Sequence, residues 1–151
     1  MKKKIPEALY EVEVYYKRPL LDTMPKISSP EEAKVILRDY TKEKFLDVKE
    51  YFWAIFLTNQ NSVLAISEIG KGNDRSVIVN SREIYQLALN LNAPRIILAH
   101  NHPSGILVHS DRDIKITHQL ANGAKLLDME ILDHLIITSE GCISYPDPIY
   151  P

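Results

Sequence analysis

Apolar residues in this chain recur with two spacings, one typical of strands and one typical of helices. Short runs of apolar, β-branched and aromatic residues between polar turns predict strands, whereas apolar residues at every third or fourth position predict amphipathic helices. The predicted strands cover residues 50–58, 62–69, 96–99, 131–138 and 142–145. The predicted helices cover residues 30 to 40–44, 80–91 and 111–127. Strands and helices alternate around a sheet that begins with a hairpin, so we expect a single three-layer α/β domain with a mixed β-sheet flanked by helices.

The longest predicted helix, residues 111–127, repeats its apolar residues with a helical period. Its expected packing stripe consists of Ile114, Thr117, Leu120, Ala121, Ala124 and Leu127. We expect this stripe to pack against the rest of the domain.

The two ends of the chain depart from the central pattern. Residues 8–17 alternate as a strand does, and Ser29 followed by Pro30 predicts a capped helix start. Three prolines in the last six residues predict a loose tail. We therefore divide the chain into an N-terminal strand and helix extension (1–45), a central domain (46–146) and a tail (147–151).

The most informative stretch begins where the strand at 96–99 ends. His100 and His102 are two residues apart, and side chains at positions i and i+2 of an extended backbone point to the same side. Ser110 and Asp113 open the next predicted helix, which can bring a carboxylate back to the end of the strand. Two histidines and one aspartate give a tetrahedral zinc three ligands and leave its fourth position open to water, as catalytic zinc requires.

Each of these residues also has a purely structural interpretation. His100 and His102 could be surface histidines in a loop that contains proline and glycine. Ser110 and Asp113 have the spacing of a capping box, in which the serine caps the helix and the acidic residue bonds back to it. The two interpretations of Asp113 are compatible, because a capped helix start is a rigid way to present a carboxylate.

Composition limits the class of protein. The chain has 151 residues and a net charge of −2, with 45% hydrophobic and 25% charged residues, as in ordinary soluble domains. This charge does not favour a large nucleic-acid interface. Cys142 is the one cysteine, so we expect no internal disulfide, no cysteine-rich zinc site and a small core residue at this position. Because no apolar run reaches membrane-spanning length and Met1–Pro6 lacks a following apolar segment, we expect a cytoplasmic protein without a signal peptide.

The spacing of the histidine segment resembles a known motif. His100-x-His102, followed after seven residues by Ser110 and after two more by Asp113, is similar to the JAMM motif of the JAB/MPN metallohydrolases. The resemblance implies that His100, His102 and Asp113 hold Zn²⁺. It also implies that the Ser110 hydroxyl donates a hydrogen bond to the oxyanion of the tetrahedral intermediate.

Two local segments resemble the RadC family in particular. They read HNHPSG at 100–105 and LDHLIIT at 132–138, and the resemblance extends over about residues 49–145. It implies the JAB fold for the central domain, an architecture related to that of the cytidine deaminases.

Amide hydrolysis also needs a general base, which in the JAMM pattern is a glutamate far upstream, near the first core strand. Glu50, just before Tyr51, Phe52 and Trp53, is the best match, and its purely structural interpretation is a solvated residue at a strand start. Glu68, near the end of the second strand of the hairpin, is the alternative. Glu83 is less favoured, because Asn80 and Glu83 have the spacing of a capping box.

Three histidines lie outside the motif, and we expect none of them to be a metal ligand. His109 corresponds to a loop position, and His118 is expected on the surface of a helix. His134 lies within the LDHLIIT segment, and we expect it to support the site structurally.

The favoured function is a zinc metallohydrolase that cleaves an amide bond, peptide or isopeptide, in an unidentified peptide or protein substrate. A zinc nucleobase deaminase is rejected, because it needs His-x-Glu and a downstream Pro-Cys-x-x-Cys. Here His102 occupies the glutamate position and the chain has a single cysteine.

The alternative function is a DNA-repair-associated or non-catalytic RadC-like module. The RadC resemblance keeps it open, since that family carries a DNA-repair label and some JAB/MPN members lack the metal. Residues 1–45, however, do not match the longer helical N-terminal region of full-length RadC-like proteins, and the acidic balance does not favour DNA. All four motif residues are present, which favours the metal-binding form. The oligomeric state is left open.

Overall fold

The computed structural model describes residues 15–73 and 76–150. The predicted strand at 8–17 lies mainly outside these residues, and its last three positions have no regular structure. The elements in chain order are η2 (Leu21–Thr23), α1 (Pro30–Thr41), β1 (Tyr51–Leu57), β2 (Val63–Lys71), α2 (Ser81–Asn90), β3 (Arg95–Asn101), α3 (Asp111–Lys125), β4 (Glu130–Ile137) and β5 (Cys142–Ile143). Within the described part of the chain, no helix is both long enough and apolar enough to cross a membrane.

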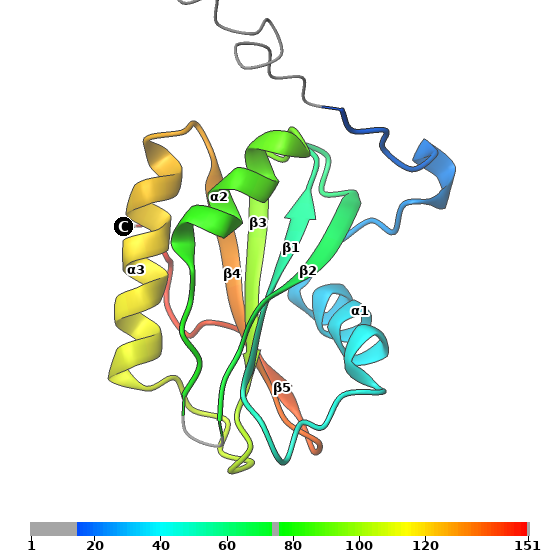
Figure 1. Cartoon of the computed structure of the whole chain (residues 1–151). Coiled ribbons are helices and arrows are strands. Elements are labelled where there is room, and N and C mark those ends of the chain that lie inside the picture. Colours follow the sequence, from blue (N-terminus) through cyan, green and yellow to red (C-terminus); the bar gives the residue numbers. More distant parts are fainter. Residues whose placement is uncertain (1–14, 74–75, 151) are drawn as a thin grey trace, which may run out of the picture.

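The five strands form one mixed sheet in the order β2-β1-β3-β4-β5 (Figure 1). β1 is antiparallel to β2 and β3, β4 runs parallel to β3, and β5 is antiparallel to β4. α1 covers one face of the sheet, and α2 and α3 cover the other face. The three-layer α/β fold with a mixed sheet is therefore confirmed.

β1 lies inside the sheet and is buried on both faces. Phe52, Ala54 and Phe56 belong to the core on the side of α2 and α3. Trp53 and Ile55, which alternate with them, belong to the core on the side of α1. Burial on both faces explains why this segment is a continuous apolar run in the sequence instead of an alternation of apolar and polar residues.

α1 begins as the sequence predicts. Ser29 is its N-cap, and the Ser29 side chain accepts a hydrogen bond from the backbone N–H of Glu32, with Pro30 as the first helical residue. Ala33 and Leu37 are buried in the core that α1 shares with β1 and β3. The helix of the N-terminal extension therefore packs directly on the sheet that carries the histidine segment.

Cys142, in the short edge strand β5, is half-buried against the core on the α1 side. Burial raises the pKa of its thiol to about 11. The protonated thiol behaves as a small apolar group, in agreement with the prediction for this residue.

α3 buries the middle of the predicted stripe but not its two ends. Thr117, Leu120, Ala121 and Ala124 are buried as predicted, and Asp113 is buried in addition. Ile114 and Leu127, by contrast, are 36% and 40% exposed. The prediction that Ile114 and Leu127 pack in the core is therefore wrong. The physical reason is that hydrogen bonds satisfy the Asp113 carboxylate and the Thr117 hydroxyl, so that polar residues can be buried at the first turns of the helix. Leu127 lies beyond Lys125, the last residue of the helix.

The C-terminal residues are more ordered than their prolines predict. Ile149 is 7% exposed and belongs to the core on the side of α2 and α3. The Tyr150 hydroxyl accepts a hydrogen bond of 2.7 Å from the backbone N–H of Ile131 at the start of β4. The expectation of a loose tail is therefore wrong for residues 146–150, because a buried side chain and a backbone hydrogen bond anchor them.

Replacing Ile149 by alanine tests this anchoring. Ile149→Ala should lower the free energy of unfolding by about 2–5 kcal/mol, because it removes a buried side chain from a packed core. Urea denaturation measures the change. Asp147→Ala, at an exposed neighbouring position, is the control and should change stability by less than about 0.5 kcal/mol. Equal effects of the two substitutions would show that Ile149 does not anchor the chain.

Candidate metal centre

His100 and His102 present their rings side by side at the end of β3. Their ring centroids are 4.7 Å apart, and the two Nε2 atoms lie 2.8 Å from each other. His100 is a buried strand residue paired with Phe52 of β1, and the backbone N–H of His102 donates to the carbonyl of Ile137 at the end of β4. The predicted presentation of two imidazoles on one side of the strand is therefore observed.

Asp113 comes to the same place from the first turn of α3. Its Oδ1 lies 3.2 Å from His100 Nε2, and its Oδ2 lies 3.4 Å from His102 Nε2. The His100, His102 and Asp113 donor atoms all lie within 4.8 Å of one another. Two imidazole nitrogens and one carboxylate oxygen form a donor set that fits a divalent transition metal with an open coordination position.

Ser110 and Asp113 form the capping box that their spacing predicts. The Ser110 side chain accepts a hydrogen bond from the Asp113 N–H at 3.2 Å. Asp113 Oδ2 accepts hydrogen bonds of 2.8 Å from both the N–H and the hydroxyl of Ser110. The same backbone therefore caps α3 and holds the carboxylate beside the histidines. In this arrangement the Ser110 hydroxyl proton points to Asp113.

The charges of the cluster are coupled. Burial alone would raise the pKa of Asp113, but His100 and His102 donate hydrogen bonds to it when they are protonated and thereby hold its pKa well below the usual range, so the carboxylate is ionised at neutral pH. The hydrogen bond with Asp113 raises the pKa of His102, whereas burial lowers the pKa of His100.

Glu50 lies immediately before β1, at the wall of a cavity of about 310 Å³. The cavity is lined by Glu50, His102, Pro103, Ser104, Ser110, Arg112 and Asp113. Backbone hydrogen bonds of 2.8 Å join the Glu50 N–H to the Asn73 carbonyl, and the Gly72 N–H to the Glu50 carbonyl. The structure thus brings Glu50 to the same cavity as the His–His–Asp cluster.

The surroundings of Glu50 favour its protonated form more than water does. Burial raises the pKa of Glu50, and the nearby Asp113 carboxylate raises it further, whereas His102 and Arg112 oppose this shift. A carboxylate with a raised pKa is better matched to proton transfer near neutral pH.

The other two candidate bases do not line this cavity. Glu68, in β2, forms an ion pair of 3.1 Å with Lys44. Glu83 lies in the first turn of α2, where its backbone N–H donates to the side chain of the N-cap Asn80. Among the three glutamates considered, the geometry therefore favours Glu50.

The three remaining histidines lie outside the donor set. His118 is exposed, and its Nε2 lies 3.3 Å from the Tyr145 hydroxyl. His109 is more buried than a loop position predicts, and its Nε2 lies 2.9 Å from the His134 carbonyl. His134 is fully buried behind His100, with its Nε2 2.8 Å from His100 Nδ1, which is the supporting position expected for it.

Asn101 is a residue of the site that the sequence does not single out. Asn101 lies between the two histidines in the sequence and is fully buried. Its Oδ1 accepts a hydrogen bond of 2.6 Å from the Tyr51 N–H. Its Nδ2 donates to the carbonyls of Leu46 and Lys49, both at 2.7 Å. Asn101 therefore ties the segment that carries Glu50 to β3. The signal that could have revealed it is an amide inside a buried strand, which must find partners.

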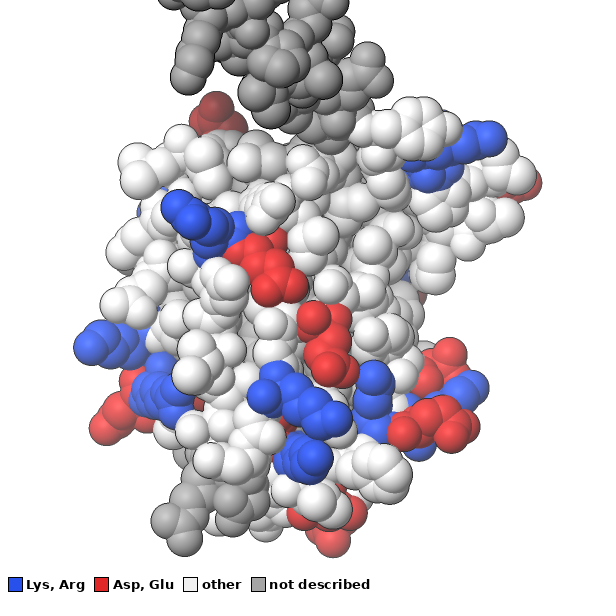
Figure 2. Space-filling view, viewed as in Figure 1, with Lys and Arg blue, Asp and Glu red and all other residues white. Residues whose placement is uncertain are grey.

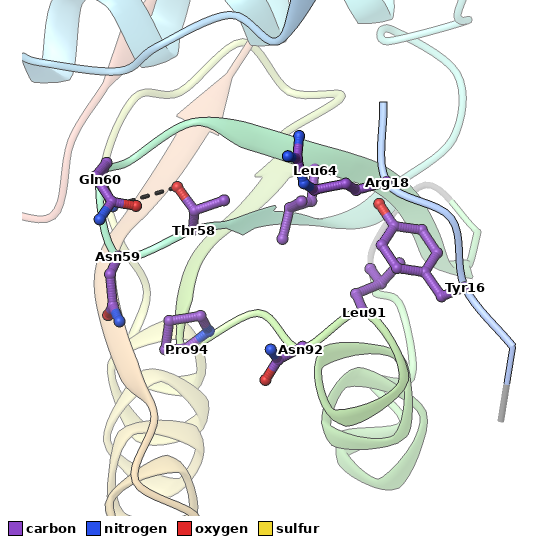
Figure 3. Close-up of a pocket in the computed structure, with 9 residues that line it drawn as sticks. All are labelled: Tyr16, Arg18, Thr58, Asn59, Gln60, Leu64, Leu91, Asn92 and Pro94. Atoms are coloured by element: carbon purple, nitrogen blue, oxygen red, sulfur yellow. Dashed lines mark hydrogen bonds between the residues drawn. The ribbon is translucent and has the colours of Figure 1, made fainter. Parts of the chain in front are cut away.

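A larger cavity, of about 490 Å³, lies at the opposite end of β1 and β3. Figure 3 shows its lining, which includes Thr58 after β1 and Pro94 before β3. The lining contains no histidine and no carboxylate. It therefore offers none of the chemistry found at the His–His–Asp cluster.

Comparison with known proteins agrees with this geometry. The model of the RadC-like JAB domain family matches residues 27–148. The chain belongs to this family. The match includes α1 as well as the sheet and the whole His–His–Asp cluster.

Relatives come from diverse bacteria. A UPF0758 protein of Flavobacterium johnsoniae is 38% identical over 124 residues, which is 82% of this chain and 53% of the relative. A UPF0758 protein of Desulfitobacterium hafniense is 38% identical over 120 residues, 80% of this chain and 52% of the relative. One of Vibrio vulnificus is 31% identical over 141 residues, 93% of this chain and 62% of the relative. The chain spans about half the length of the first two relatives, and none of these names states an activity.

Two serine substitutions separate capping from support of Asp113. Ser29→Ala and Ser110→Ala should each lower the free energy of unfolding by about 0.5–2 kcal/mol, the usual loss for an N-cap. Ser110→Ala should in addition weaken binding of a divalent metal by about tenfold or more, because it removes the hydroxyl that donates to Asp113 Oδ2. Denaturation and metal titration measure the two effects. Unchanged metal affinity in both variants would show that Ser110 acts only as a cap.

Proposed function

We propose that the chain is a zinc-dependent metallohydrolase that cleaves an amide bond in a peptide or protein substrate, peptide or isopeptide. The observation that carries this proposal is the convergence of His100, His102 and Asp113 at a cavity that also holds Glu50. His100 Nε2, His102 Nε2 and an Asp113 carboxylate oxygen would hold the metal. Two imidazoles and a carboxylate with one position open are typical of catalytic zinc.

Zinc bound at these three side chains would lower the pKa of a water molecule and polarise the substrate carbonyl. Glu50 accepts a proton from the attacking water and returns it to the departing amine. Its raised pKa suits both transfers, because a group that holds its proton more tightly than an ordinary glutamate is a better base.

The Ser110 hydroxyl lines the same cavity and supplies a hydrogen bond to the oxyanion. Its proton is donated to Asp113 Oδ2 in this structure, so this role requires the hydroxyl to rotate toward the substrate. The Ser110 N–H continues to hold Asp113 Oδ2 during that rotation.

The alternative, a DNA-repair-associated or non-catalytic RadC-like module, receives less support. On the face shown in Figure 2, basic and acidic side chains are interspersed over a largely uncharged surface. A protein that binds the phosphate backbone of DNA concentrates positive charge on the contacting face. A non-catalytic module would also have no need of a glutamate with a raised pKa beside the His–His–Asp cluster.

The first test is metal content. Wild-type protein loaded with zinc and desalted should retain about one zinc ion per chain, since one set of three ligands is present in the cluster. His102→Ala should lose most of it, while His118→Ala, at an exposed histidine outside the donor set, should keep it. Elemental analysis by mass spectrometry gives the stoichiometry. A wild-type protein that stays metal-free would overturn the zinc assignment.

The second test separates the base from the ligands. Glu50→Gln should retain zinc and fold but lose about 100-fold or more in the rate of cleavage of peptide and isopeptide libraries. Glu68→Gln, a matched change at the glutamate paired with Lys44, should cleave at nearly the wild-type rate. Equal rates for Glu50→Gln and wild type would place the base elsewhere. No cleavage by wild type across broad amide libraries would favour the non-catalytic module.

The pH dependence of the wild-type rate follows from the shift at Glu50. Glu50 must be ionised to accept a proton, so the rate should fall as the pH drops through its pKa. Since burial raises that pKa, the decline should begin at a higher pH than for an ordinary glutamate. Zinc content measured at each pH separates this decline from metal loss. A rate that stays constant down to the ordinary glutamate range, with zinc retained, would contradict the role of Glu50.

A further inference from the structure

Behind the candidate metal ligands, a chain of buried polar groups runs from α3 through β4 to β3. Thr117 Oγ1 lies 2.6 Å from the backbone carbonyl of Asp113 and 2.6 Å from His134 Nδ1. His134 Nε2 lies 2.8 Å from His100 Nδ1. Thr117 and His134 are fully buried and His100 is 1% exposed, so water does not compete for these contacts.

The direction of each hydrogen bond follows from the chemistry of the groups. A carbonyl oxygen only accepts, so the single hydroxyl proton of Thr117 goes to the Asp113 carbonyl. Toward His134 the Thr117 oxygen must then accept, which places a proton on His134 Nδ1. Full burial favours the neutral ring, which carries one proton, so His134 Nε2 accepts from His100 Nδ1.

These hydrogen bonds also determine which nitrogen of His100 faces the His–His–Asp cluster with a lone pair. With its proton on Nδ1, neutral His100 has a lone pair on Nε2, the atom that lies 3.2 Å from Asp113 Oδ1. Packing holds this arrangement, because the Phe52 ring stacks on His100 at 6.1 Å and meets His134 edge-on at 5.5 Å.

We propose that Thr117 and His134 are positioning residues that fix His100 in the tautomer with a lone pair on Nε2, directed at the metal. This inference rests on the proposed metal function. The chain of bonds starts at the Asp113 carbonyl and ends beside the Asp113 carboxylate, so one turn of α3 places one ligand and orients another. Such outer partners of metal-binding histidines typically contribute about 10- to 100-fold to metal affinity.

α1 contains a natural control for Thr117. Thr41 is also fully buried in a helix, and its hydroxyl donates a hydrogen bond of 2.9 Å to the carbonyl of Leu37, four residues earlier. Thr117 makes the same type of bond to Asp113, with the further contact to His134. Thr41→Val therefore reproduces the loss of a buried hydroxyl in a helix without touching a histidine.

The experiment compares Thr117→Val, Thr117→Ser and Thr41→Val with wild type in the full chain. Zinc affinity, measured by competition with a chelator at fixed pH, should fall about 10- to 100-fold in Thr117→Val. Thr117→Ser keeps the hydroxyl and should bind zinc with about the wild-type affinity. Thr41→Val should also leave the zinc affinity unchanged. Unfolding free energies of the two valine variants show whether they lose comparable stability.

The second readout needs no metal and no substitution. Long-range ¹⁵N–¹H correlation spectra of the imidazoles in the metal-free wild type should show His100 and His134 protonated on Nδ1. A proton on His100 Nε2 would overturn the inference, even if Thr117→Val failed to fold. A Thr117→Val variant that binds zinc as tightly as the wild type would also overturn it. A wild type that binds no zinc would instead overturn the proposed function, while the spectra would still decide the tautomer.

Discussion

The candidate metal centre depends on where the histidine protons go. Two imidazole nitrogens and a carboxylate converge at the end of β3, and each imidazole can keep a lone pair there only if its other nitrogen donates elsewhere. His102 Nδ1 lies 2.7 Å from the Ile106 carbonyl, and His100 Nδ1 lies 2.8 Å from His134. Lone pairs that face one another repel unless a cation lies among them. The same hydrogen bonds that satisfy the outer nitrogens therefore make the inner face of the cluster a place for a positive charge.

One strand organises both sides of the site because its residues alternate in direction. His100 and His102 face the cluster, while Asn101 between them bonds to the backbone of the segment before β1. That segment ends in Glu50, which enters the same cavity as His102. β3 thus carries His100, leads directly into His102 and fixes the backbone that carries the candidate base. The arrangement explains how residues about 50 positions apart in sequence are held next to each other.

Much of the fold could be predicted because its signals are local. Ser29, Asn80 and Ser110 are N-caps where the sequence places them, and the spacing of His100, His102 and Asp113 brings these residues together as expected. What the sequence could not reveal depends on partners distant in the chain. The predicted stripe includes Thr117, but it carries no information about the partners of the Thr117 hydroxyl, which are His134 and the Asp113 carbonyl. The order of the C-terminal residues likewise depends on the distant core around Ile149.

We infer that His100, His102 and Asp113 hold a single zinc ion. X-ray diffraction from crystals of zinc-loaded protein, with anomalous maps recorded on both sides of the zinc absorption edge, would locate the ion directly. We expect one strong peak, within bonding distance of the Nε2 atoms of both histidines and of a carboxylate oxygen of Asp113. Fully loaded crystals with no peak among these three side chains, or with the zinc held by other residues, would contradict it.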